Sequence, residues 1–264
     1  SEYFVAIYFI LIALSFCMSI YIINKNDNPT YKLTWVLLIM AVPVFGGLIY
    51  LLFGGQKVPK ELRKRDSEAL ENYQEISWQN TEIMEALEAE DPLAHKQANY
   101  LWKNAIFPIY NHTETTYFPV GEEKFKAMVE ELKKAESFIF MEYFIIAPGV
   151  MWDTILDILI DKVKQGVEVR VMYDDAGCIT TLPQDYYLTL RRLGIQAKVF
   201  NPIKPRLAMQ MNNRDHRKIL VIDGKVGMTG GINLADEYIN QKERFGHWKD
   251  CSVMIRGEAV WNLT

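Results

Sequence analysis

Two long apolar runs open the chain. Residues 3–23 read YFVAIYFILIALSFCMSIYII and residues 33–53 read LTWVLLIMAVPVFGGLIYLLF, and neither run contains a charged side chain. A helix needs about 20 apolar residues to cross the hydrocarbon core of a bilayer. Pro43 inside the second run is tolerated in a membrane helix, because neighbouring helices can satisfy the freed backbone groups. The pattern predicts two transmembrane helices within residues 1–55.

The charges that flank these runs predict an orientation. Residues 56–65, QKVPKELRKR, carry five basic residues against one acid, whereas residues 24–32 between the runs carry two lysines. Positive charge favours the cytoplasmic side, so we expect the chain from residue 56 onward to be cytoplasmic. Residues 66–91 carry nine acids and no Lys or Arg, which predicts an amphipathic linker helix that an anionic membrane would repel.

From about residue 111, helical and strand-like patterns alternate. Helical spacing of apolar residues recurs in 121–135, 151–166 and 182–194, and strand-like runs occupy 137–145, 167–173 and 195–200. Asp223-Gly224 is a strong signal for a two-residue hairpin turn, and residues 250–257 supply a final strand. Strands that alternate with helices imply crossover connections. The sequence therefore predicts an α/β domain with a mixed, largely parallel sheet flanked by helices.

These patterns divide the chain into three predicted parts. Residues 1–55 form the membrane hairpin, residues 56–110 the basic exit and acidic helical linker, and residues 111–264 the α/β domain. The three cysteines are odd in number and far apart, so reduced thiols are expected rather than a disulfide framework or a metal site. A net charge of −4 does not favour nucleic acid as a partner, because nucleic-acid binding usually needs a basic surface.

The candidate chemistry lies in the stretch NNRDHRKILVIDGKVGMTGGIN, which ends at Asn233. His216 and Lys218 are two residues apart on a strand-like run, so they should share one face, roughly 7 Å apart along the strand. There the imidazole and the ammonium can both approach one tetrahedral anion. Gly230 and Gly231 let backbone come close to a ligand, and the Asn233 amide can donate a hydrogen bond to an oxygen. Phosphate fits such a site best.

Each part of this pattern is weak alone, because strand ends often carry polar side chains on a solvated face. The ordered set H-x-K-x4-D-x6-G-G-x-N, which includes Asp223, is far more specific. Its spacing resembles the HKD motif of the phospholipase D superfamily. The surrounding text NNRDHRKILVIDGKVGMTGGINLADEYI, with two apolar runs ahead of it, resembles bacterial cardiolipin synthases over nearly the whole chain.

The resemblance implies that residues 111–264 are a phospholipase D-like half-domain. Enzymes of this family carry two motifs in two similar halves, whereas this sequence has one. The other histidines stand as HKQ (His95), HTE (His112) and HWK (His247), and none is followed by the rest of the motif. We therefore expect either the front half of a longer protein or two copies that pair their motifs.

The resemblance also implies a reaction. His216 would attack the phosphodiester of phosphatidylglycerol, release glycerol and form a phosphatidyl-histidine, and a second phosphatidylglycerol would then complete cardiolipin. Lys218 and Asn233 would hold the phosphoryl oxygens. Asp223 would orient a histidine, or would serve only as a turn residue before Gly224. No cofactor and no metal is implied.

Several further residues are weaker candidates. Glu142 lies mid-strand and should sit near the pocket or pair with a backbone group. Asp174 and Asp175 end a strand, where a turn or helix-cap role is expected. A basic run next to His216 could hold a second lipid headgroup or form a solvated rim; it comprises Lys204, Arg206, Arg214 and Arg217.

Three function classes remain open at this stage. The first is a membrane phosphatidyltransferase that makes cardiolipin. The second is a hydrolase of the same superfamily, acting on lipid or, as a homodimer, on nucleic acid. The third is a non-catalytic membrane module that binds anionic lipid, which a lone half-site would favour.

Overall fold

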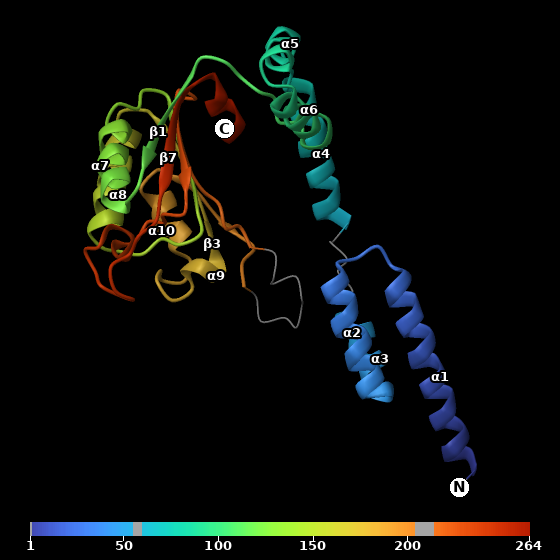
Figure 1. The fold of residues 1–264 in the computed structure, drawn as a ribbon. Coiled ribbons are helices and arrows are strands. Elements are labelled where there is room, and N and C mark those ends of the chain that lie inside the picture. The colour runs from blue at the N-terminus through green and yellow to red at the C-terminus, as the bar shows by residue number, and fades with distance from the viewer. Residues whose placement is uncertain (1, 55–59, 204–213) are drawn as a thin grey trace. The chain divides into compact units, whose positions relative to one another are not determined.

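The computed structural model describes residues 2–54, 60–203 and 214–264 (Figure 1). Contacts divide the chain into two compact units. One unit covers Ser1–Arg65 and the other begins at Asp66 and contains the whole β-sheet. Each unit is described by itself below.

Among the described residues, the N-terminal unit contains three complete helices, α1 (Glu2–Asn24), α2 (Pro29–Ala41) and α3 (Pro43–Phe53), and the beginning of a fourth at Lys60. Ile22, Trp35, Ile39 and Tyr50 form a small buried cluster among them. Most large apolar side chains of α1 are nevertheless exposed. Its segment Tyr3–Asn24 is long and apolar enough to cross a membrane, and a bilayer would cover this surface.

The second predicted span is not one continuous helix. It is interrupted at Val42, whose backbone leaves the helical region with φ −136° and ψ 75°. Pro43 causes the break, because its ring clashes with the α conformation of the preceding residue and it has no N–H to donate. Among the described residues, α1 is thus the one helix with the length of a membrane span.

The acidic linker is likewise divided rather than continuous. Helices α4 (Lys60–Ile76), α5 (Thr81–Glu90) and α6 (Pro92–Ala105) replace the single helix expected at 66–91. Asn80 ends the first break by accepting a hydrogen bond from the Glu82 N–H. Asp91 caps α6 in the same way through Leu93 and Ala94. Such caps satisfy orphan N–H groups and start new helices.

A seven-stranded sheet forms the centre of the larger unit, in the order β1-β7-β6-β5-β2-β3-β4. Its strands are β1 (Thr113–Phe118), β2 (Phe138–Tyr143), β3 (Glu168–Asp174), β4 (Gln196–Phe200), β5 (Lys218–Ile222), β6 (Val226–Gly230) and β7 (Ser252–Gly257). Only β2–β3 and β3–β4 pair in parallel, and the other four pairs are antiparallel. The sheet is mixed, as predicted, but "largely parallel" was wrong, because the β5–β6 hairpin and β7 add antiparallel strands beside β2.

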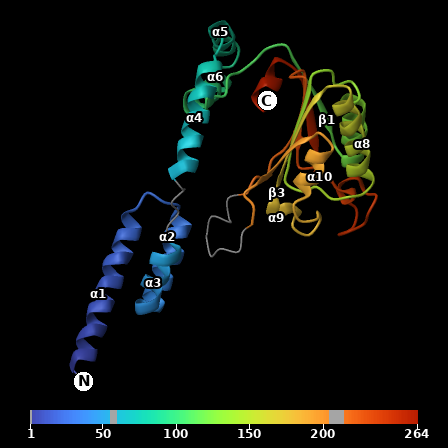
Figure 2. The ribbon, with the colours of Figure 1, turned by 180° about the vertical axis from the view of Figure 1, so that it is seen from behind.

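Helices pack on one face of this sheet. They are α7 (Gly121–Leu132), α8 (Val150–Lys164) and α10 (Tyr186–Arg192), with the one-turn α9 (Asp175–Cys178) after β3 (Figures 1 and 2). Trp152 of α8 donates its indole N–H to the Tyr186 hydroxyl, which joins α8 to α10. The main core lies between these helices and the sheet. On the other face, the 3-10 helix η3 (Glu258–Leu263) packs over Gly227, where a Cβ would lie 2.8 Å from Leu263 Cδ1.

The β5–β6 hairpin turns through three residues, Asp223, Gly224 and Lys225, because Ile222 pairs with Val226. The prediction of two turn residues was short by one. Asp223 and Gly224 both have positive φ, at 53° and 63°. This conformation explains why Asp-Gly is found here, since few other residue pairs adopt it without strain.

Candidate active site

His216 and Lys218 lie at one edge of the sheet, where β5 begins. Lys218 pairs with Tyr143 on β2 and is 3 % exposed, so its stem lies on the helix-covered face. His216 comes two residues earlier and is exposed. Its ring rests against Phe144, with the ring centroids 4.6 Å apart. An accessible imidazole therefore stands beside a buried lysine stem.

Lys218 is oriented toward the histidine. Its Nζ donates to the His216 carbonyl oxygen at 2.7 Å and lies 5.4 Å from the centre of the Phe144 ring. Burial lowers the pKa of Lys218, while Asp250 and Asp215 act in the opposite direction. Within the described residues, this ammonium donates to one acceptor, the His216 carbonyl oxygen. Two of its three N–H groups therefore remain available to an anion.

The segment before His216 is held by Asp174, at the end of β3. Its fully buried carboxylate accepts the Asp215 N–H at 3.0 Å. It also caps α9 by accepting from the backbone N–H groups of Ala176 and Gly177, which is the cap role expected of it. Arg214 is drawn inward here: its Nη1 lies 3.5 Å from the Asp174 carboxylate and 2.9 Å from the Asn201 carbonyl oxygen.

The two glycines of the motif make room for neighbouring elements. A Cβ on Gly230 would lie 2.5 Å from the Cys251 carbonyl oxygen. A Cβ on Gly231 would lie 2.1 Å from a carboxylate oxygen of Asp250. The glycines therefore let the start of β7 and the Asp250 carboxylate approach the edge that carries Lys218. Asp250 is a site neighbour that the sequence patterns did not single out.

Asn233 is buried and its side-chain amide is engaged at both ends. The Oδ1 atom accepts the Ile145 N–H at 2.9 Å, and the Nδ2 atom donates to the Tyr238 hydroxyl at 2.7 Å. These contacts join the loop after β6 to the loop after β2. These bonds hold the two loops together, and the expected hydrogen bond from Asn233 to phosphoryl oxygens stays a prediction.

Asp223 lies at the far end of β5 from His216. Its carboxylate accepts hydrogen bonds from three backbone N–H groups, those of Glu136, Ser137 and Phe138, at 2.7 to 2.9 Å. Although partial burial opposes ionisation, these bonds hold the pKa of Asp223 below its usual range. Of the two roles left open by the sequence, the turn residue is the one that these contacts match.

Glu142 faces away from His216 and Lys218. It pairs with Ile219, so its side chain lies on the sheet face opposite that of Lys218. There Oε1 lies 2.6 Å from Arg217 Nη2. Burial, and then the adjacent Asp215 carboxylate, raise the pKa of Glu142 to about 8. The expectation that Glu142 lines the phosphate pocket does not fit this register.

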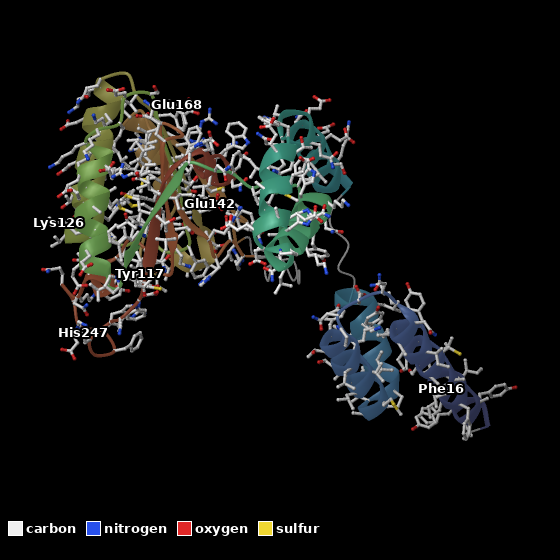
Figure 3. The ribbon with its side chains drawn as sticks, turned by 45° about the horizontal axis from the view of Figure 1, so that its top comes forward. Phe16, Tyr117, Lys126, Glu142, Glu168 and His247 are labelled. Carbon is white, nitrogen blue, oxygen red and sulfur yellow. The ribbon has the colours of Figure 1, made fainter. Side chains whose placement is uncertain are left out.

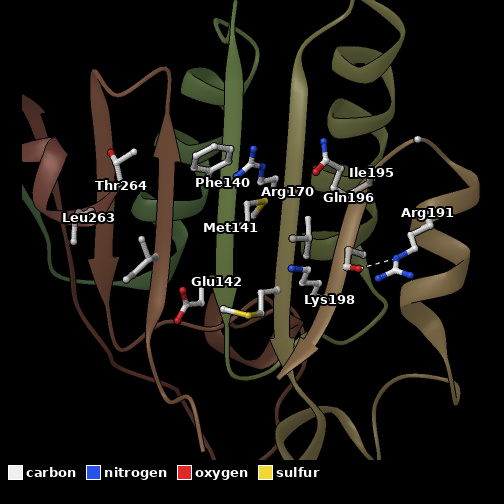
Figure 4. Close-up of a pocket in the computed structure, with 15 residues that line it drawn as sticks. Phe140, Met141, Glu142, Arg170, Arg191, Ile195, Gln196, Lys198, Leu263 and Thr264 are labelled. Atoms are coloured by element: carbon white, nitrogen blue, oxygen red, sulfur yellow. Dashed lines mark hydrogen bonds between the residues drawn. The ribbon is translucent and has the colours of Figure 1, made fainter. Parts of the chain in front are cut away.

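A cleft of about 630 Å³ lies on that open face (Figure 4). Its walls come from β2, β3, β4 and the C-terminal η3, and include Phe140, Glu142, Arg170, Lys198, Leu263 and Thr264. The His216 edge is not part of it. In Figure 4 the Glu142 carboxylate stands at the end of the cleft nearest the carboxyl end of β2. The cleft and the motif are thus separate features of the two sheet faces.

Lys124 is a second lysine beneath the motif. It is fully buried on α7 and donates to the Ile232 carbonyl oxygen at 3.1 Å, directly between the glycines and Asn233. Its Nζ also lies 5.2 Å from the centre of the Tyr143 ring. Burial lowers the pKa of Lys124 to about 7. A lysine on the apolar stripe of a helix was the signal that could have revealed it.

Two predicted site residues, Lys204 and Arg206, lie outside the described residues. Arg217 of the same basic run pairs with Asp215 and Glu142 instead of forming a free rim. Within 2–54, 60–203 and 214–264, no three His, Cys, Asp or Glu side chains gather as a metal site would require.

Two family models match this chain, one over the motif-bearing domain and one over the N-terminal helices. Residues 128–245 match the model of the "Cardiolipin synthase, PLD-like domain", and residues 5–55 match that of the "Phospholipase_D-nuclease N-terminal" segment. Residues 128–245, which carry the motif, thus belong to the phospholipase D-like domain family of cardiolipin synthases.

Relatives extend the similarity along nearly the whole chain. An uncharacterized protein of Streptococcus mutans is 47 % identical over 93 % of this chain and 53 % of its own length. A cardiolipin synthase of Alkalihalophilus pseudofirmus is 38 % identical over 93 % and 49 %. The chain thus spans about half the length of these relatives.

Among solved structures, NucT from Helicobacter pylori is 11 % identical, with a TM-score of 0.45, over 57 % of this chain and 91 % of NucT. This similarity concerns the fold alone.

Proposed function

We propose that this chain is the membrane-anchored first half of a cardiolipin-forming phosphatidyltransferase. The proposed reaction joins two phosphatidylglycerol molecules and releases glycerol. The observation that carries the proposal is that the exposed His216 ring and the Lys218 ammonium both lie against the Phe144 ring at one sheet edge. The family match and the cardiolipin synthases among its relatives support the same class of reaction.

In the proposed first step, a ring nitrogen of His216 attacks phosphorus. A phosphorus–nitrogen bond forms, the bond to the glycerol oxygen breaks, and glycerol leaves after that oxygen takes a proton. In the second step, the headgroup hydroxyl of another phosphatidylglycerol attacks phosphorus, displaces His216 and gives up its proton. The covalent intermediate divides one difficult displacement into two easier ones.

Lys218 would stabilise negative charge on the phosphoryl oxygens in both steps. A preorganised ammonium in a partly buried place is worth more than the same charge in water. Asp174 would position His216 by holding the Asp215 N–H. We propose structural roles for Asp223 and Asn233, since hydrogen bonds within the fold occupy both side chains.

The proton for the leaving glycerol has to come from another acid. We propose that a second motif supplies it, from a further half-domain as in relatives of twice this length or from a second copy of this chain. Without that acid the alkoxide is a poor leaving group, so the half-site alone should be a poor catalyst.

We also propose a membrane arrangement for the N-terminal unit. Helix α1 would form one span. Helices α2 and α3 fold back on each other, since the Tyr31 hydroxyl donates to the Gly54 carbonyl oxygen at 2.8 Å and the Trp35 and Tyr50 ring centroids are 5.3 Å apart, so they would enter the bilayer as a re-entrant hairpin. The basic residues of 56–65 would keep the catalytic part on the cytoplasmic side. The exposed apolar side chains of α1 support the first span.

The test is an assay in liposomes that contain phosphatidylglycerol, with released glycerol and lipid products measured separately. Two proteins are compared, the 264-residue chain and the chain extended through a second half-domain. His216→Ala is made in both. We expect cardiolipin from the extended protein and none from its His216→Ala variant.

Each other outcome is informative. Cardiolipin from the 264-residue chain alone would mean that two copies share a site. Phosphatidic acid in place of cardiolipin would identify a hydrolase. Binding to anionic liposomes without any product from either protein would contradict the proposal and favour a non-catalytic lipid-binding module.

A further inference from the structure

An exposed loop projects from the site edge of the sheet. All seven residues of 241–247 are exposed, and Phe245 is 76 % exposed, the most exposed large apolar side chain of the larger unit. Figure 3 shows His247 of this loop at the extremity of the domain. Gly246 has φ +89° and nothing within 4 Å of a Cβ position, so the tip stands in open space.

The base of this loop is firmly closed. The Asn240 side chain accepts the Trp248 N–H at 2.7 Å and donates to the Trp248 carbonyl oxygen at 3.0 Å, so one side chain bridges the two ends. The Trp248 ring packs against Tyr238, with ring centroids 4.7 Å apart. The loop is therefore an ordered projection with a fixed base.

This base is connected to the motif. Tyr238, under Trp248, accepts the hydrogen bond from Asn233 Nδ2. The loop lies between β6 and β7, whose facing ends, Gly230 and Ser252, pair at the edge where β5 begins. A displacement of the loop would thus be transmitted to the segment that carries the glycines and Asn233.

Two more exposed apolar side chains lie at the same edge, one at the start of α8 and one just after α9. Val150 follows β2 and is 55 % exposed, and Ile179 follows β3 and is 60 % exposed. The ends of β2 and β3 meet this edge because Tyr143 pairs with both Lys218 and Tyr173. Figures 1 and 2 both place α9 and the loop after β6 at the same end of the sheet.

The charges of the loop favour an anionic partner. Lys242 and Lys249 are exposed, and neither has an ion pair within the part of the chain that the structure describes. Arg244 is held at the base by Glu237, at 2.9 Å. Glu243 is the single acid of 241–249, against three basic residues.

We propose that the loop 241–247 docks on an anionic lipid bilayer, with Phe245 at the boundary between headgroups and acyl chains. Lys242 and Lys249 lie at the headgroup phosphates. An aromatic side chain flanked by basic residues suits this interface. The docking holds His216 at the level of the headgroups. Only this consequence of the docking rests on the proposed function.

The test measures depth in the membrane rather than turnover. The complete chain is reconstituted in vesicles of phosphatidylserine and phosphatidylcholine, which lack the headgroup of the proposed substrate. Cys17 and Cys251, the two exposed cysteines, are replaced by Ser, while the buried Cys178 is retained. Phe245→Cys is labelled with an environment-sensitive fluorophore. Lys134→Cys is the matched control, at the Asp223 end of the sheet with its side chain 66 % exposed.

Nitroxide groups on lipid acyl chains then quench any label that enters the bilayer. We expect about a twofold or larger loss of emission at position 245 and none at position 134, since interfacial side chains reach about 5–10 Å into the boundary. Lys242→Gln and Lys249→Gln should each lower the ratio of docked to undocked loop roughly fivefold, because each removes one charge near an anionic surface. Lys164→Gln, an exposed lysine elsewhere, should not.

Three results would overturn the proposal. Absence of quenching at position 245 is the first, and equal quenching at positions 134 and 245 is the second. The third is a blue-shifted label that lipid nitroxides do not quench but that responds to protein concentration, which would identify a second copy as the partner. His216→Ala should dock as the parent does, so failure of docking and failure of catalysis are distinguishable.

Discussion

His216 and Asp223 belong to one motif and lie at opposite ends of β5. The two ends differ in exposure and in how far their polar groups are already hydrogen-bonded. At the beginning of the strand, the His216 ring is exposed and touches Phe144, and Lys218 keeps N–H groups for a ligand. At the end of the strand, three backbone N–H groups saturate Asp223. The polar groups at the His216 end can still bind a ligand, whereas hydrogen bonds within the fold occupy the carboxylate at the Asp223 end.

This difference shows that residues at a fixed spacing in one motif can have different roles. His216 lies two residues before β5, and Asp223 is the first residue after this strand of five. The spacing is therefore a property of the hairpin that presents the histidine. The following predictions separate the two ends, starting with the largest expected effect.

Replacing His216 should abolish chemistry and spare stability. His216→Ala in the extended protein should lower cardiolipin formation by more than about a thousandfold, since loss of a nucleophile leaves only binding and electrostatic terms. Its urea midpoint should equal that of the parent. His112→Ala, which removes another exposed histidine, is the matched control and should stay fully active. A large loss of stability in His216→Ala would contradict the comparison.

Asp223 should show the reverse behaviour. Asp223→Ala should lower the free energy of unfolding by about 2–3 kcal/mol, because three backbone N–H groups lose their acceptor. Asp223→Asn, which keeps one acceptor oxygen, should lose less. Equilibrium unfolding in urea measures both, and activity is expressed per folded molecule. A thousandfold loss of kcat in a folded Asp223→Asn protein would restore a catalytic role for Asp223.

Asp174 should affect the histidine end through position alone. Asp174→Asn can keep the α9 cap but weakens its hold on the Asp215 N–H, so we expect kcat to fall roughly ten- to a hundredfold, the usual result of a small misplacement. KM should change little. Asp175→Asn is the neighbouring control, because Asp175 accepts from the Ile203 N–H instead. Equal losses in both variants would indicate general damage to this corner of the fold.

Glu142 should produce the smallest effect, visible as a pH dependence. Its pKa rises from 4.5 to about 8 on folding, so the folded state holds a proton that the unfolded state loses. Native stability relative to Glu142→Gln should therefore decline as pH rises from about 4.5 to about 8 and stay constant above that. A shift of this size would amount to nearly 5 kcal/mol at about 1.36 kcal/mol per pKa unit, and solvent screening at this partly exposed ion pair reduces the expected decline to about 1 kcal/mol. Parallel stability curves for the two proteins across this range would show that Glu142 is ionised in the fold.

Local patterns were sufficient for many features. The strands at 138–143, 168–174 and 196–200 and the helices between them follow from periodicity, which depends on the burial of one face. The placement of His216 and Lys218 at one edge follows from the two-residue period of a strand. Hydrophobic spacing alone predicts a continuous acidic linker and a continuous second apolar run, whereas Pro43, Asn80 and Asp91 each carry a local signal for a break.

Other features depended on contacts between distant segments. Whether Glu142 or its neighbour Tyr143 shares a face with Lys218 depends on how β2 and β5 are aligned, and a shift of one residue would exchange them. The antiparallel majority of the sheet arises because β7 inserts between β1 and β6. The backbone N–H groups that bind Asp223 come from a segment tens of residues away, and so does the Asp174 carboxylate that holds the segment before His216. Side-chain periodicity is local, whereas strand register and hydrogen-bond partners are settled only when the whole sheet packs.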